Sequence, residues 1–149
     1  MKNFSDLPDI KDQSISIEIA LTPIMHNGIP YCNVRCNDKN LFDEYLDRPF
    51  VIATNVPLID DINIVIELAE KKYHPDKETA ISIDSISVDG IGIQDHCYDL
   101  IEYHNDQDVD AKTMYLGFNG RWILSIPGPF YQWWHEKSGQ GWLIKPVRA

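Results

Sequence analysis

Cysteines and long apolar runs are both scarce in this 149-residue chain. It has three cysteines, and no apolar run approaches the ~20 residues that a membrane-spanning helix needs. An odd number of cysteines gives no disulfide framework, and the opening residues, MKNFSDLPDIKD, lack the charged region, apolar run and cleavage site of a signal peptide. These absences predict a reduced, cytosolically made protein without a membrane segment.

Positive charge is also sparse. The chain has 13 Lys and Arg against 23 Asp and Glu, which gives a formal net charge of −10. The basic residues are scattered, so no local patch is available to hold a phosphate backbone. The composition therefore argues against nucleic acid as a partner.

No group of residues has the spacing of a catalytic or metal centre. Cys32 and Cys36 are four positions apart on an expected strand, whereas zinc sites have a tight turn between their thiolates. His96 and Cys97 are adjacent, so on a strand they would point to opposite faces and could not form a nucleophile and base pair.

Alternating carboxylates at Asp106, Asp108 and Asp110 offer oxygen ligands of the kind that calcium prefers. They lack the glycine and the distal glutamate of a calcium-binding loop, so a solvated acidic loop is the better interpretation. No two carboxylates are singled out as a glycosidase pair. We predict a protein that is not an enzyme and has no metal or cofactor.

Two-residue alternation dominates the rest of the chain. From Ser14 to Thr22, isoleucine or leucine at every second position alternates with polar or small residues, which indicates a half-buried strand. Further short strands are expected around 32–36, 41–46, 50–54, 62–68, 80–93, 98–103, 113–126 and 141–144.

Two Asn-Gly pairs, at 27–28 and 119–120, lie between apolar runs and predict tight hairpins, because both central residues take positive φ. The first hairpin would place Leu21 opposite Val34, with both side chains on the core face. The second would place Gly117 opposite Trp122.

The apolar positions change parity between residues 81 and 93. Ile81 and Ile83 share one parity, whereas Ile86 and Val88 share the other. A strand that switches its buried face in this way needs a bulge or a crossing between two sheets.

Pro129 can begin a short helix that has Phe130, Trp133 and Trp134 on one side and Gly139 as its terminator, although an extended segment is also possible. Together these patterns predict a single all-β domain over residues 13–149, an antiparallel β-sandwich or jelly roll with a short helical turn near the C-terminus. Residues 1–12 are expected to form a flexible arm.

Aromatic residues gather near the end of the sequence. They could form a platform on which sugar rings stack, or a structural cluster in the core. A missing side chain at Gly117, opposite Trp122, favours the core alternative. The candidate ligand-binding residues are Tyr115, Trp122, Tyr131, Trp133, Trp134 and Trp142.

Two segments, ISIDSISVDGI and LGFNGRWILSIPGPFYQWW, resemble uncharacterised small proteins of T4-like tailed phages, including those of cyanobacteria. The chain resembles more loosely the carbohydrate-binding modules of the calcium-assisted sandwich type, but it lacks their cluster of metal-binding carboxylates. The phage resemblance implies a viral protein, located in the cytoplasm of the infected host or in the virion.

The sequence thus favours a non-enzymatic recognition module that binds a glycan or a virion partner through an aromatic surface. A structural or assembly component of the virion is the first alternative. An acidic inhibitor of a host protein is a further one, motivated by the charge of −10.

Overall fold

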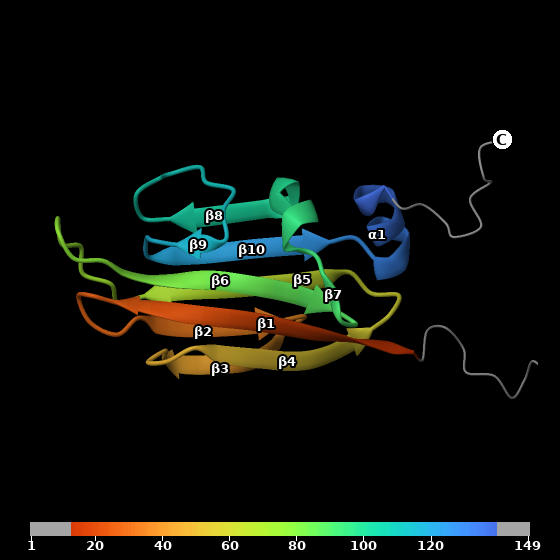
Figure 1. Cartoon of the computed structure of the whole chain (residues 1–149), viewed down its shortest axis with the longest axis horizontal. Coiled ribbons are helices and arrows are strands. Elements are labelled where there is room, and N and C mark those ends of the chain that lie inside the picture. The colour runs from red at the N-terminus through yellow and green to blue at the C-terminus, as the bar shows by residue number, and fades with distance from the viewer. Residues whose placement is uncertain (1–12, 140–149) are drawn as a thin grey trace, which may run out of the picture.

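Two antiparallel β-sheets packed face to face, with one short helix at one end, make up residues 13–139, the part of the chain that the computed structural model describes (Figure 1). This architecture confirms the predicted antiparallel β-sandwich with a short helix near the C-terminus. The predicted arm at 1–12, the last predicted strand and Trp142 lie outside the described residues.

The first sheet has the order β4-β1-β6-β7, with β9 also paired to β6, and the second has the order β3-β2-β5-β10-β8. The first sheet consists of β1 (Ser14–Met25), β4 (Phe50–Pro57), β6 (Thr79–Val88), β7 (Ile91–Gly92) and β9 (Tyr115–Leu116). The second consists of β2 (Tyr31–Cys36), β3 (Lys39–Tyr45), β5 (Ile62–Ala69), β8 (Ile101–Asn105) and β10 (Gly120–Ile126). The helical segments are η3 (Gln94–His96), η4 (Tyr98–Leu100) and α1 (Phe130–Ser138).

The core lies between the sheets and is built from the alternating positions that the sequence predicts. Every second residue of β1 from Ile15 to Leu21 is buried, as is every second residue of β5 from Ile62 to Leu68. β1 and β5 each have a neighbouring strand on both sides, so their backbones are paired within their own sheet. Their apolar faces are covered by the opposite sheet.

The hairpin predicted at Asn27-Gly28 is wrong. β1 pairs with β4 and β6, whereas β2 pairs with β3 and β5, so the two strands belong to opposite sheets. Leu21 and Val34 are both buried, as predicted. Alternation identifies the face that a strand buries, but a partner facing it across the core satisfies the same pattern as a partner beside it.

The hairpin predicted at Asn119-Gly120 is also wrong. β9 pairs with β6 in the first sheet, whereas β10 pairs with β5 and β8 in the second. The side chain of Asn119 accepts a hydrogen bond from the backbone N–H of Lys71 and donates one to its carbonyl, both at 2.8 Å. The Asn-Gly pair therefore holds a crossing between sheets.

The predicted bulge is confirmed in β6. Ala20 pairs with Ser85 and Leu21 with Ile83, so Asp84 has no partner in β1. Its carboxylate accepts hydrogen bonds from the hydroxyls of Thr22 and Ser82. One extra residue explains the change of parity, because it returns the following isoleucine to the core face.

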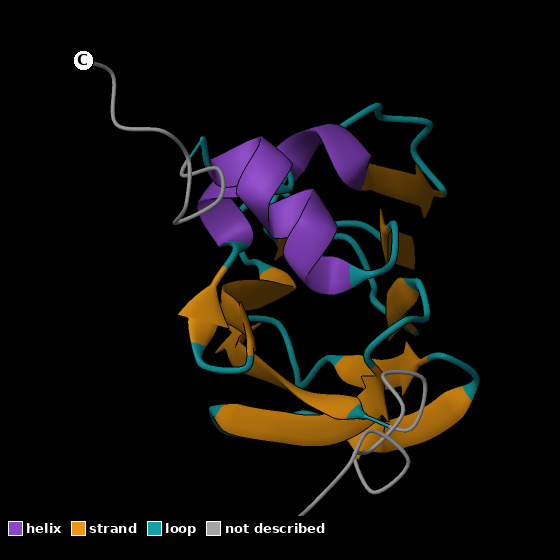
Figure 2. Cartoon of the chain, turned by 90° about the vertical axis from the view of Figure 1, so that its right-hand side faces the viewer, coloured by secondary structure: helices purple, strands orange, loops and turns teal. Residues whose placement is uncertain are grey.

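The short helix is confirmed as well. α1 follows Pro129 and ends at Gly139, whose φ of 73° is the left-handed geometry of a helix terminator. Phe130, Trp133 and Trp134 are its buried residues. Figure 2 shows the helical segments grouped on one side of the strands. Within the described part of the chain, no helix combines the length and apolar character needed to cross a membrane.

Candidate functional site

Three of the predicted ligand-binding residues lie in the core. Trp122 is fully buried and donates from its indole Nε1 to the carbonyl of Thr113 at 2.6 Å. Trp133 and Trp134 are on the buried face of α1 and contact Phe130, which belongs to the same helix. Their ring faces are engaged by protein, which matches the core alternative for this part of the aromatic group.

The other two described candidates are exposed but lie apart. Tyr115 is in β9, and Tyr131 is in α1 towards the opposite end of the sandwich (Figure 1). The hydroxyl of Tyr131 donates to the Asp89 carboxylate at 2.8 Å, and that carboxylate also accepts from the Ser16 N–H. The structure therefore does not bring the five described candidates together on one surface.

A buried lysine organises the surroundings of Tyr115. The Lys71 side chain is only 3% exposed, and its Nζ forms an ion pair with Glu78 and donates to the Gly117 carbonyl at 2.5 Å. The same Nζ lies 5.1 Å from the centre of the Tyr73 ring, a cation-π distance. A buried ammonium is tolerated only with such partners, so Lys71 ties together segments that are distant in sequence.

Tyr115 is fixed from two directions. Its hydroxyl lies 3.3 Å from the Glu78 carboxylate, on the oxygen that is not bonded to Lys71. Its ring lies over Gly117, where an added Cβ would be 3.1 Å from a ring carbon. The Gly117 position thus accommodates the Tyr115 ring, rather than the Trp122 indole as the sequence suggested. Burial, followed by the charge of Glu78, raises the pKa of Tyr115.

Tyr73 is anchored through its hydroxyl. That hydroxyl donates to the Asp106 carboxylate and accepts from the backbone N–H of Asn119 at 2.9 Å. Burial and the hydrogen bond to Asp106 raise the pKa of Tyr73, and the same hydrogen bond lowers the pKa of Asp106. We call Lys71, Tyr73, Glu78, Asp106 and Tyr115 the tyrosine site.

The tyrosine site was largely missed at the level of sequence. Lys71, Tyr73 and Glu78 belong to the polar segment 70–78, which has no apolar periodicity to place it against the rest of the fold. The signal available there was a single aromatic residue between charged ones, which does not identify a partner.

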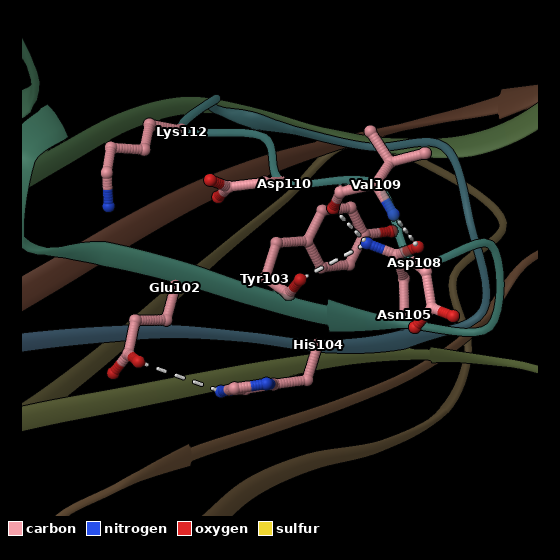
Figure 3. Close-up of a pocket in the computed structure, with 8 residues that line it drawn as sticks. All are labelled: Glu102, Tyr103, His104, Asn105, Asp108, Val109, Asp110 and Lys112. Carbon is pink, nitrogen blue, oxygen red and sulfur yellow. Dashed lines mark hydrogen bonds and ion pairs between the residues drawn. The ribbon is translucent and has the colours of Figure 1, made fainter.

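A second feature is a hollow of about 560 Å³ beside β8, shown in Figure 3. The Asn105 side chain shapes it: the amide donates to the Val109 carbonyl at 2.8 Å, and its oxygen accepts from the N–H groups of Gln107 and Val109. This network folds the acidic loop back alongside the strand. The lining includes Glu102, Tyr103, Asn105, Asp108, Asp110 and Lys112.

The alternating carboxylates considered for calcium do not converge. Asp106 bonds to Tyr73, whereas Asp108 and Asp110 line the hollow. Among residues 13–139, no three or more histidine, cysteine, aspartate or glutamate side chains are grouped so that they could hold a metal ion.

The cysteines are structural. All three are buried, and burial raises the pKa of Cys32 to about 12 and that of Cys36 and Cys97 to about 11. The His96 ring packs edge-on against Trp134, with centroids 5.1 Å apart, and the Cys97 thiol lies 3.8 Å from the Gln94 carbonyl oxygen. Nothing in this arrangement activates a thiol for catalysis.

Comparison with known proteins gives a likeness in fold. Neither a protein family nor a curated protein matches the sequence. The solved structure of vCBM60 in complex with galactobiose matches with a TM-score of 0.50 and 13% identity, over 75% of this chain and 97% of that one.

A selenomethionine form of vCBM60 matches with a TM-score of 0.49 and 12% identity, over 75% of this chain and 91% of that one. It comes from work on circular permutation between two families of calcium-dependent carbohydrate binding modules. At these identities the likeness concerns the sandwich fold. The phage origin, a role in the virion and inhibition of a host protein stay predictions.

Proposed function

We propose that this protein is a non-enzymatic carbohydrate-binding module that contacts its glycan through the tyrosine site. The observation that carries the proposal is the pair of exposed rings, Tyr73 at 45% and Tyr115 at 37%, both in contact with the Lys71 and Glu78 ion pair. Aromatic rings offer an apolar face to the C–H face of a sugar, and neighbouring carboxylates can accept its hydroxyl protons.

The rings are held before any ligand arrives. Tyr73 is anchored by Asp106 and Asn119, and Tyr115 by Glu78 and the space above Gly117. Fewer rotamers are then lost on binding, which favours affinity for a small ligand. The half-exposed Glu78 carboxylate, next to the Tyr115 hydroxyl, supplies polar contacts that would orient a sugar.

The aromatic residues proposed from the sequence enter this function in different roles. Tyr115 is a direct contact. Trp122, Trp133 and Trp134 support the fold from the core, and Tyr131 is a separate exposed ring on α1. Trp142 lies outside the described residues.

Isothermal titration calorimetry with galactobiose, followed by bacterial surface polysaccharides, tests the proposal. Tyr73→Ala and Tyr115→Ala should each weaken binding by about tenfold or more, as expected when an aromatic contact is removed. Tyr98→Ala is the matched control, because Tyr98 is similarly exposed, at 41%, but lies in η4. Binding that survives both substitutions, or no binding to any glycan, contradicts the proposal.

A further inference from the structure

Among residues 13–139, no strand pairs with the outer backbone edge of β8 in the second sheet. β8 is the last strand in the sheet order, and within the described part of the chain its one partner is β10, through residues 101–105. Edge strands carry unpaired backbone N–H and C=O groups, to which an extended segment of another protein can bind as an additional strand.

Two side chains occupy acceptors on this strand. Lys112 Nζ donates to the Ile101 carbonyl at 2.8 Å. The Asn105 amide donates to the Tyr103 carbonyl at 3.1 Å (Figure 3). These donors stand where the N–H groups of a neighbouring antiparallel strand would stand, two residues apart. Each is a single hydrogen bond from a side chain and can be exchanged for a backbone donor.

The hollow beside this edge is acidic. Three carboxylates, from Glu102, Asp108 and Asp110, line it. The one lysine of the lining is already engaged, because Lys112 bonds to a carbonyl. A partner with complementary charge would therefore be cationic.

We propose that the hollow beside β8 binds an extended peptide segment of a partner protein that carries lysine or arginine at alternate positions. The segment adds to the second sheet next to β8, and its backbone N–H groups replace the donors of Lys112 and Asn105. Its basic side chains face Glu102, Asp108 and Asp110. This activity goes beyond glycan binding and uses different residues.

Charge and backbone geometry select this occupant over two others. A second copy of the chain would bring identical carboxylates together, which like-charge repulsion disfavours. A glycan has no row of N–H donors at the spacing of the Ile101 and Tyr103 carbonyls. An extended peptide has both the spacing and, with basic residues, the charge.

The test uses two fluorescein-labelled hexapeptides, one alternating lysine with valine and one alternating glutamate with valine, in anisotropy titrations of the whole chain. The lysine peptide should bind, more weakly as salt is added, and the glutamate peptide should not. Hydrogen exchange at the Tyr103 amide should slow in the complex, because that N–H points to the same side as its carbonyl.

Variants distinguish binding of a peptide beside β8 from the alternative that Lys112 and Asn105 merely cap the strand edge. Glu102→Gln should weaken binding about threefold, as expected for an exposed ion pair, while Asp47→Asn, a remote and similarly exposed carboxylate, should not change it. Lys112→Met removes a competing donor and should bind the lysine peptide severalfold more tightly. Equal binding of both peptides, no binding by either the wild type or Lys112→Met, or unchanged exchange at Tyr103 overturns the proposal.

Discussion

Lys71 and Glu78 form an ion pair in which the lysine side chain is 3% exposed and the glutamate side chain is 43% exposed. Burial is thus unequal within the pair. The glutamate can be solvated alone, whereas the ammonium relies on Glu78, the Gly117 carbonyl and the Tyr73 ring. Removing the carboxylate leaves a buried charge with less compensation, which is costlier than losing a surface ion pair.

We therefore expect Glu78→Gln to lower the free energy of unfolding by about 2 kcal/mol, below the range for a fully buried pair because Glu78 is half exposed. Urea unfolding at neutral pH measures this change. Glu18→Gln, at an exposed position of β1, should stay within about 0.5 kcal/mol of the wild type. Equal effects of the two substitutions would contradict the role assigned to the ion pair.

Gly120 is required by close backbone approach. A Cβ at this position would overlap the His104 carbonyl and lie 2.6 Å from Asn105 Cα, in the adjacent strand β8. Gly120→Ala should therefore cost more than about 3 kcal/mol of unfolding free energy, since backbone has to move. Gly90→Ala is the comparison: Gly90 has a φ of 81° with open space around it, so alanine there should cost about 1–2 kcal/mol. A milder effect at Gly120 than at Gly90 would show that the backbone at residues 119–120 and in β8 can move apart to make room for the Cβ.

The three thiols should not react with thiol reagents in the folded protein. Burial raises the pKa of Cys32 to about 12 and that of Cys36 and Cys97 to about 11, so little thiolate is present at pH 8 and reagent has no access to it. With Ellman's reagent we expect no prompt reaction in native buffer and three thiols in guanidinium chloride. Prompt native labelling of any cysteine would mean that the core opens at that residue.

Alkaline pH should destabilise the protein through Tyr103. Burial raises its pKa from 10.0 to about 12, so the folded state holds this proton more tightly than the unfolded chain does. The stabilisation is complete below about pH 10 and is lost as the pH rises towards 12. Tyr103→Phe should cost about 1 kcal/mol at pH 7, through the hydrogen bonds with Phe118, and should make the alkaline loss less steep.

Urea unfolding at pH 7 and at several values between 9 and 11 checks this expectation. Tyr98→Phe serves as the control, because it removes the same hydroxyl from an exposed tyrosine. If Tyr103→Phe follows the wild-type pH profile, another group controls alkaline unfolding.

Acrylamide quenching of tryptophan fluorescence tests whether the tryptophans within residues 13–139 are buried, in a variant that lacks Trp142. In Trp142→Phe the remaining tryptophans are Trp122, Trp133 and Trp134, all buried. Acrylamide should quench their native emission weakly and their emission in guanidinium chloride strongly. Strong native quenching would place at least one indole at the surface and return it to the list of candidate glycan contacts.

Sequence patterns predicted which faces are buried better than which strands are neighbours. Alternation in β1 and β5 follows from burial on one side, so the pattern is visible in the sequence. The bulge at Asp84 was visible for the same reason, as a change of parity. Pro129 and Gly139 marked α1 because their backbone preferences act locally.

Strand neighbours and the tyrosine site depend on contacts between distant segments. Asn-Gly signals a turn, but Asn119 instead bonds to the backbone of Lys71, and no local pattern shows this choice. Likewise, Lys71 meets Gly117 across 46 positions of sequence. Polar segments carry no periodicity, so their tertiary partners are not readable from sequence alone.

The placement of β5 between β2 and β10 has a consequence for synthesis of the chain. β2 precedes β5 in sequence, but β10 follows it only after β6 to β9 have been made. One backbone edge of a strand whose inward residues are fully buried thus waits unpaired until Ile126 has emerged. For that interval the nascent chain presents an open, apolar strand edge, the kind of surface that chaperones cover.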